Sequence, residues 1–161
     1  MKGVILGIIL VISSQLTDVR TLFFKDNSEK TNLEIITKTT GQSDPVLKAY
    51  NGLATMRKAE HTYNPYKKLS YFNKGKDKLE TAIKTKPKNA EIRFIRLSAQ
   101  LNLPDFLNYN KQIDSDFEMV YRALKNEELS ESNAFNNNVI GFLFNNDLIN
   151  ESEARNLKAL Y

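Results

Sequence analysis

The single histidine is the first place to look for catalysis. His61 is the only histidine among the 161 residues, and the chain has no cysteine. A serine-type triad would therefore have to use this one imidazole as its base. The sequence has no Gly-x-Ser-x-Gly turn and no acid paired with His61 to orient its ring. We expect His61 to be a packed or surface residue, and we expect the protein not to be an enzyme.

The sequence also lacks the residues that usually form metal and phosphate sites. Zinc is held by three or four cysteine, histidine or acidic side chains, and one histidine without cysteine does not supply them. Asp114 and Asp116 alternate as calcium ligands do, but Phe117 follows them and the glycine of a calcium loop is missing. Gly75-Lys76 lacks the preceding glycine and the following serine or threonine of a phosphate loop. We expect no metal or cofactor, and we assign the two aspartates to a helix cap and a solvated face.

One polar cluster could recognise a partner. Arg93, Arg96 and Gln100 stand at positions i, i+3 and i+7, so one helix would present all three on the same face. Guanidinium groups on the concave side of a helical array bind carboxylates well. These three residues are the candidate partner-binding site. The alternative is pairing within the chain, with the acidic C-terminal half.

Basic residues gather in the stretch that begins at Arg57 and ends at Lys88, where ten of them stand against three acids. The candidate basic surface consists of Lys67, Lys68, Lys74, Lys76 and Lys78. Interleaved tyrosines would also suit nucleic acid, but the export signal described below argues against that partner. Anionic lipid headgroups or polysaccharide are the expected targets if this surface is functional. The alternative is a solvated lysine face without a partner.

The elements that carry these residues are predicted to be helices. Prolines at 45, 65, 87 and 104 punctuate the chain, and strict alternation of apolar and polar residues is nowhere sustained. Apolar stripes at helical spacing occupy residues 71–84 and 105–124. Residues 18–40 are predicted to form one helix or a broken pair, with a polar centre at 25–32. A helix near 133–144, a turn at 145–150 and a last helix are expected to complete an all-α fold.

Predicted helix starts support this pattern. Asn89 precedes one apolar run, while Ser115 with Glu118 and Asn150 with Glu153 have the spacing of capping boxes. Since Ser115 could begin a helix of its own, residues 105–124 are left open as one helix or two.

Five residues carry a resemblance to a known family. Phe72, Gly75, Leu79, Ala82 and Pro87 have the spacing of the second helix and closing turn of a tetratricopeptide (TPR) repeat. Small residues at 75 and 82 would let neighbouring helices approach, and the bulky ones would fill the space between them. The chain thus resembles a TPR-like protein over residues 71–89, although the next helix, 90–100, departs from the repeat pattern. The resemblance implies an antiparallel helix-pair array, an α-α superhelix of about 6–8 helices.

A longer set of segments resembles uncharacterised exported TPR-like proteins of the flavobacterial type. That resemblance implies export and helical architecture, and it brings no catalytic residue with it. The segments are 64–65, 68–72, 91–97 and 104–107.

The first 14 residues have the layout of a secretory signal peptide. Lys2 precedes an apolar run from Val4 to Ile12, and Ser13 and Ser14 offer small side chains for cleavage. A helix of that length rises roughly 14 Å, against about 30 Å of hydrocarbon, so it would not span a bilayer. We expect cleavage after Ser14 and no membrane span or lipid anchor thereafter. The alternative is a buried N-terminal strand or helix.

Together these patterns predict a signal peptide at 1–14 and a single helical TPR-like domain at 15–161. We expect a periplasmic or secreted module that docks a protein or peptide, with no nucleic acid as partner. The alternative function is binding to anionic lipid or glycan through the basic helix face.

Overall fold

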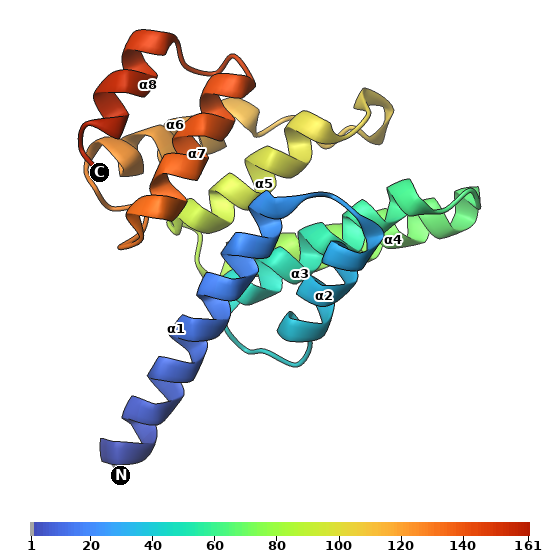
Figure 1. Ribbon diagram of the computed structural model, residues 1–161. Helices are drawn as coiled ribbons and strands as arrows, with labels where there is room; N and C mark the ends of the chain where they lie inside the picture. The colour runs from blue at the N-terminus through green and yellow to red at the C-terminus, as the bar shows by residue number, and fades with distance from the viewer. Residues whose placement is uncertain (1) are drawn as a thin grey trace. The chain divides into compact units, whose positions relative to one another are not determined.

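The computed structural model describes residues 2–161, with side chains from Ser14 onward. Within this range the chain forms eight α-helices and two short 3-10 turns, and it contains no strand (Figure 1). The predictions of an all-α fold and of about 6–8 helices are therefore confirmed. The elements are α1 (Lys2–Lys25), α2 (Glu29–Thr39), α3 (Pro45–Arg57), η1 (Lys58–His61), α4 (Pro65–Thr85), α5 (Ala90–Asn102), η2 (Asp105–Leu107), α6 (Ile113–Lys125), α7 (Asn133–Asn145) and α8 (Glu151–Lys158).

The chain divides into two compact units. The N-terminal unit contains residues 1–82 and the C-terminal unit contains residues 83–161, so the boundary lies near the end of α4. Each unit has its own buried apolar residues. The single domain over 15–161 stays a prediction.

The helical stretch after residue 18 is broken into two helices, one of the two arrangements that the sequence allowed. The Asp26 carboxylate accepts a hydrogen bond from the Ser28 backbone N–H at 2.8 Å. The Ser28 hydroxyl in turn accepts one from the Thr31 N–H at 3.2 Å and caps α2. Hydrogen bonds from the Ser28 and Thr31 side chains lower the pKa of Asp26 from 3.8 to about 2. These local bonds compete with a continuous helix, so α1 ends at Lys25.

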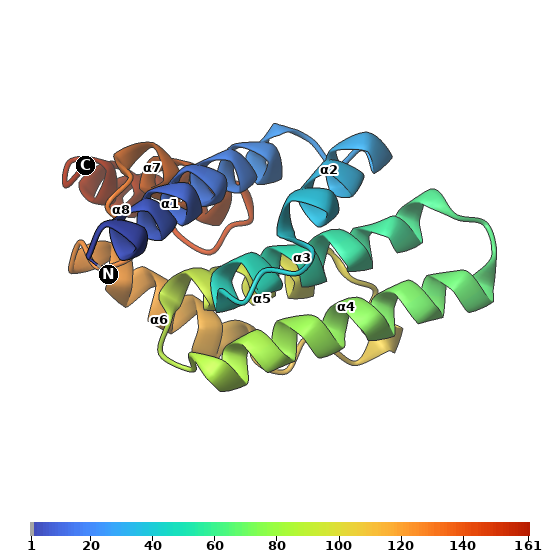
Figure 2. The ribbon, with the colours of Figure 1, turned by 90° about the horizontal axis from the view of Figure 1, so that it is seen from below.

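Helix α3 is the centre of the N-terminal unit. It lies between α2 and α4 (Figure 2), and ten of its thirteen residues are buried. On one side Tyr50 meets Phe23 of α1 edge to face, with the ring centroids 5.6 Å apart. Val19 of α1 and Ile35 of α2 are also fully buried. A helix that is covered on most sides needs an apolar surface all round, which explains its weak amphipathic pattern.

On the other side, α3 crosses α4 at two glycines. A Cβ atom added to Gly52 would lie 2.7 Å from the Gly75 carbonyl oxygen and 2.9 Å from the Leu79 nitrogen. A Cβ atom added to Gly75 would lie 2.7 Å from the Met56 nitrogen. The backbones therefore touch where no side chain fits. The prediction that Gly75 lets a neighbouring helix approach is confirmed, and its partner is Gly52.

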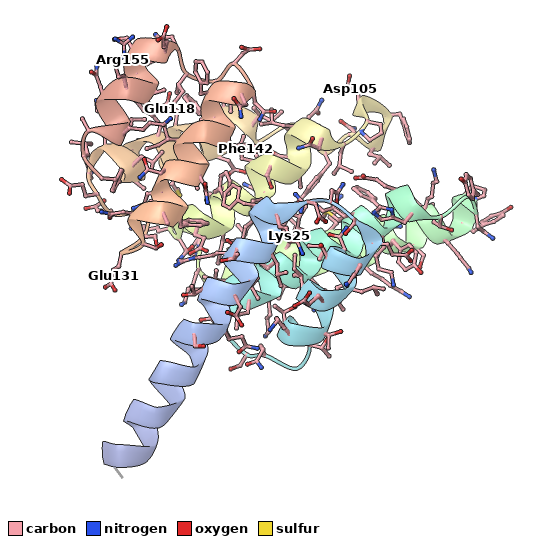
Figure 3. The ribbon with its side chains drawn as sticks, viewed as in Figure 1. Lys25, Asp105, Glu118, Glu131, Phe142 and Arg155 are labelled. Carbon is pink, nitrogen blue, oxygen red and sulfur yellow. The ribbon has the colours of Figure 1, made fainter. Side chains whose placement is uncertain are left out.

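The C-terminal unit is built around α5, which buries nine of its thirteen residues. The Phe94 ring meets two rings of α7 edge to face, Phe142 at 5.2 Å and Phe135 at 6.1 Å. Figure 3 labels Phe142 on α7. The Asn89 side chain accepts a hydrogen bond from the Ile92 N–H, which confirms the predicted N-cap.

The last helices also follow the prediction. Helix α7 is followed by a polar turn and by α8, which begins with the predicted capping box of Asn150 and Glu153. The Tyr161 hydroxyl donates to the Leu124 carbonyl oxygen at 2.6 Å, which ties the last residue to α6.

Two details of residues 105–124 were predicted wrongly. Asn108 has a left-handed backbone with φ of 51°, which ends the turn η2, and a single α-helix begins only at Ile113. Ser115 is therefore not an N-cap, because it already lies inside α6 and its hydroxyl donates back to the Gln112 carbonyl oxygen. Phe106, assigned to the apolar stripe, is 84% exposed because it belongs to η2 and not to α6.

The predicted signal peptide falls largely outside the described side chains, which begin at Ser14. Helix α1 continues through Ser14, and among its described side chains Val19 and Phe23 are buried and come after the expected cleavage site. Cleavage after Ser14 stays a prediction. In the described part of the chain, no helix is both long enough and apolar enough to cross a membrane.

The glycine crossing generates a stability prediction. Gly52→Ala should lower the free energy of unfolding by about 1–3 kcal/mol, because the new methyl group must push two backbones apart. Gly141 of α7 is the matched control, since a Cβ atom there would meet nothing within 4 Å. Gly141→Ala should stabilise by about 0.5–1 kcal/mol through helix propensity alone. Urea unfolding followed by circular dichroism measures both, and a Gly52→Ala protein as stable as wild type would contradict the crossing.

Candidate functional site

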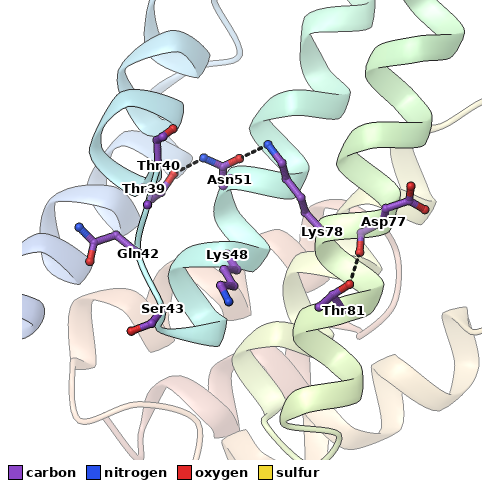
Figure 4. A pocket seen from close by; sticks show the side chains of 10 residues that line it. Thr39, Thr40, Gln42, Ser43, Lys48, Asn51, Asp77, Lys78 and Thr81 are labelled. Carbon is purple, nitrogen blue, oxygen red and sulfur yellow. Dashed lines mark hydrogen bonds between the residues drawn. The ribbon is translucent and has the colours of Figure 1, made fainter.

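The N-terminal unit contains an open pocket of about 670 Å³. Its walls are the loop between α2 and α3 and the adjoining sides of α3 and α4 (Figure 4). Gly41 in that loop has φ of 78°, a left-handed conformation that favours glycine. The volume lies within the usual range for small-ligand sites. The lining residues are Thr39, Thr40, Gly41, Gln42, Ser43, Lys48, Asn51, Asp77, Lys78 and Thr81.

A buried amide organises one side of this pocket. Asn51 is 5% exposed, and its Nδ2 donates to the Thr39 hydroxyl at 2.8 Å. Its Oδ1 accepts a hydrogen bond from the Lys78 Nζ at 2.6 Å, and the Thr55 hydroxyl lies 3.4 Å from the same ammonium group. Three helices thus contribute to one polar chain, which Figure 4 shows from Thr39 to Lys78.

Lys78 is held in a partly buried position by this chain. Desolvation lowers its pKa from the ordinary lysine value, and the positive charge of Lys74 lowers it further. An ammonium group has three N–H donors, and Asn51 and Thr55 are positioned to accept two of them. The third can serve an acceptor in the pocket. A carboxylate or a carbonyl oxygen of a ligand would provide the third acceptor for the Lys78 ammonium.

The remaining lining residues offer both hydrogen-bond donors and hydrogen-bond acceptors. Hydroxyl and amide side chains such as Thr40, Gln42 and Ser43 can donate and accept. Lys48 adds a second positive charge, and the Asp77 carboxylate adds an acceptor. No histidine or cysteine lines the pocket. This arrangement suits reversible binding of a ligand that carries both donors and acceptors.

The candidate basic surface does not lie on a single face. Lys67, Lys74 and Lys78 are seven and four residues apart along α4, so they follow one side of the helix. Lys76 is on another side, with its ammonium 5.8 Å from the centroid of the Phe72 ring. Lys67 and Lys68 are exposed in the first turns of α4. Only Lys78 of the five lines the pocket.

The candidate partner-binding residues of α5 are brought together in the C-terminal unit. The Arg96 Nε and NH2 groups contact the two carboxylate oxygens of Asp116 at 2.6 and 2.8 Å. Arg93 NH1 contacts the same carboxylate at 3.1 Å, and two further Arg93 nitrogens donate to the Pro87 carbonyl oxygen. Gln100 is buried, and its Nε2 lies 3.4 Å from the Gln112 Oε1.

The pairing is therefore within the chain, which is the alternative that the sequence left open. Asp116 is 0% exposed, so its assignment to a solvated face is wrong. The acid is buried because α6 packs its first turn against the two arginines of α5. Binding of a partner carboxylate by Arg93 and Arg96 stays a prediction.

His61 contributes to a loop contact. It is exposed, and its Nε2 lies 2.9 Å from the Asn27 carbonyl oxygen. Glu60 accepts a hydrogen bond from the Asn27 side chain at 2.6 Å. Among the residues that the structure describes, no three histidine, cysteine or acidic side chains converge as metal ligands would.

The pocket residues other than Lys78 were missed from the sequence. One signal was present, because Asn51 and Thr55 are four residues apart and are flanked by apolar residues in the second half of the helix. Polar residues at that spacing in a buried helix share one face and need partners.

The buried ion pair generates a prediction with a matched control. Asp116→Ala should lower the free energy of unfolding by about 3–5 kcal/mol, because it removes the buried carboxylate that both Arg93 and Arg96 contact. Asp114 stands two residues earlier and is exposed. Asp114→Ala should change stability by less than about 0.5 kcal/mol. Urea unfolding measures the change in the free energy of unfolding for both variants. Equal changes would show that the buried ion pair contributes no more to stability than an exposed aspartate.

Geometry alone thus identifies two polar clusters, one in each unit. The pocket beside Lys78 is open to a ligand, whereas the arginines of α5 already share an internal carboxylate. Comparisons of the chain with protein-family models, with curated proteins and with solved structures gave no match.

Proposed function

We propose that this chain is an exported, non-enzymatic, TPR-like module that docks a peptide or an extended segment of another protein in the pocket of the N-terminal unit. The observation that carries the proposal is the position of Lys78. Its ammonium is anchored by Asn51 and Thr55 at the pocket wall and is partly desolvated. A positioned charge of this kind is a recognition group for a carboxylate or a carbonyl oxygen.

A peptide fits the chemistry of the lining. An extended peptide presents one donor and one acceptor in nearly every residue, and the pocket offers side chains that do both. The Lys78 ammonium would bind a carboxylate of the peptide, while Lys48 adds a second positive charge to the lining. A pocket that is open to one side accepts a continuous chain without requiring the partner to end there.

The helix arrangement supports the same class of function. The crossing of α3 and α4 at Gly52 and Gly75 is the close approach that TPR-like helix pairs use, and Leu79 and Ala82 of α4 are fully buried. Arrays of helix pairs present extended grooves that bind peptides. This argument is by analogy of architecture, whereas the pocket itself supplies the location and the chemistry.

Export is supported by the N-terminal layout of Lys2, the apolar run and the two serines. Val19 and Phe23 of α1 are buried and lie beyond Ser14. A chain that begins at Gln15 would therefore keep Val19 and Phe23 and their packing.

Cross-linking in the native host tests the proposal. A photoreactive benzoylphenylalanine in place of Gln42, in the pocket wall, should capture a protein or peptide, whereas the same group in place of the exposed Asn156 of α8 should not. Lys78→Met should lower the yield about tenfold or more, because a hydrogen bond from a charged group contributes about 1.5–3 kcal/mol. Lys84→Met, a change of the same kind on an exposed lysine of α4, is the control.

The captured chain should begin near Gln15 and come from the exported fraction, which sequencing of its N-terminus determines. No adduct from Gln42 would contradict the docking proposal. An intact N-terminus in a cytoplasmic fraction would contradict export.

The pH dependence of binding follows from the lowered pKa of Lys78. Its ammonium attracts a carboxylate only while it is protonated, so binding should hold below its folded pKa and fall as the pH rises through it. That fall should begin below the ordinary lysine value of 10.5. Lys78→Arg should keep its charge to higher pH, since the arginine guanidinium stays protonated throughout the pH range in which a lysine titrates. The cross-linking yield in the isolated fraction, measured against pH, gives both profiles, and identical profiles would exclude Lys78 as the binding group.

A further inference from the structure

The connection between α3 and α4 exposes an unusual group of side chains. It lies at the end of the α3–α4 hairpin, on the right in Figure 2. Tyr63 is fully exposed, Tyr66 is 85% exposed and Leu69 is 53% exposed. We call these three residues, together with Lys67 and Lys68 between them, the aromatic tip. Large apolar side chains that gather on a surface commonly mark an interaction site.

The aromatic tip is held on a rigid element. Pro65 is the first residue of α4, and the Asn64 side chain accepts a hydrogen bond from the Lys67 N–H at 3.1 Å. Proline at this position and an asparagine before it are favourable helix-start residues. Tyr66 and Leu69 are three residues apart, so α4 presents them on the same face. Their exposure is therefore built into the start of a helix.

The charge around these side chains is positive. In the part of the chain that the structure describes, neither Lys67 nor Lys68 forms an ion pair with an acid. Lys58 of η1 adds a third ammonium nearby, 4.9 Å from the centroid of the Tyr71 ring. The acidic side chain that precedes these residues in the sequence, Glu60, accepts a hydrogen bond from the Asn27 side chain.

We propose that the aromatic tip docks the protein on the surface of an anionic lipid bilayer. Tyrosine rings favour the boundary between headgroups and acyl chains, where the ring is in apolar surroundings and the hydroxyl stays hydrated. Leu69 adds apolar area to the same face. Lys67 and Lys68 face lipid phosphates, while their methylene stems cover apolar surface. The aliphatic Leu69 favours lipid over polysaccharide, because a sugar polymer offers it no apolar medium.

This contact is independent of the peptide pocket. Of the lysines on α4, the pocket uses Lys78, which is ten residues beyond Lys68 along the helix. The same chain could thus hold a peptide while it rests on a bilayer.

A single tryptophan can report on the contact, because the chain has none of its own. In Tyr66→Trp, the emission should shift to the blue when vesicles of phosphatidylglycerol and phosphatidylcholine are added, and it should stay unchanged with phosphatidylcholine alone. The shift should disappear in high salt, which screens surface charge. The control probe is Phe106→Trp at another exposed aromatic position, and its emission should not move.

Variants separate the two parts of the aromatic tip. In vesicle co-sedimentation, Lys67→Gln combined with Lys68→Gln should weaken binding roughly 25-fold, at about fivefold for each lysine near an anionic surface. The same exchange at the exposed Lys111 and Lys158 should weaken it much less. Tyr66→Ser combined with Leu69→Ser should also reduce binding, and circular dichroism should show an unchanged helix content. Lys78→Met should bind vesicles as wild type does.

The proposal is overturned if Tyr66→Trp shows no blue shift on anionic vesicles. It is also overturned if dextran sulfate binds through the same lysines while the vesicles cause no shift, because the surface would then recognise a polyanion and not a bilayer. Loss of vesicle binding in Lys78→Met would show that the aromatic tip and the pocket are not independent.

Discussion

The close approach of α3 and α4 at Gly52 and Gly75 is the constraint on which the N-terminal unit depends. Because the two backbones touch at these glycines, the register of one helix against the other is fixed there. One turn away along α4, the same register places Lys78 beside Asn51. In the other direction, toward the first turn of α4, the two helices reach the end of the hairpin, where Tyr66 is exposed. A bulkier residue at the crossing would separate the helices and enlarge the gap that Lys78 now bridges.

Each unit also buries a polar contact between side chains of two helices that a purely apolar core would not need. In the N-terminal unit it is the bond between Asn51 and Thr39, and in the C-terminal unit it is the pair of Arg96 and Asp116. Such contacts contribute little net stability compared with apolar packing, but an incorrect register would leave them unsatisfied. We infer that they select one arrangement of helices whose apolar faces alone would tolerate several. The two contacts differ in that only the first borders an open pocket.

Features that depend on neighbouring residues in the chain were predictable from the sequence, and features that depend on distant ones were not. The caps at Asn89 and Asn150 satisfy backbone N–H groups within three residues, so their spacing was sufficient. Ser115 has the same spacing but no free helix start, because the left-handed turn at Asn108 delays α6 until Ile113. The burial of Asp116 depends on arginines that are 20 and 23 residues away in the chain. The role of Asn51 was hidden for the same reason, since its partners lie on two other helices.

The environment of Lys78 also affects its reactivity. An amine attacks an acylating or aldehyde reagent only in its neutral form, and a lowered pKa raises the fraction of neutral amine at a given pH. Among the lysines of α4, Lys78 should therefore be labelled out of proportion to its exposure. An amine-directed reagent with a peptide-like tail would combine this reactivity with the hydrogen bonds of the pocket. The pocket wall that positions the Lys78 ammonium for a partner thus also makes this lysine a selective site for chemical labelling of the native chain.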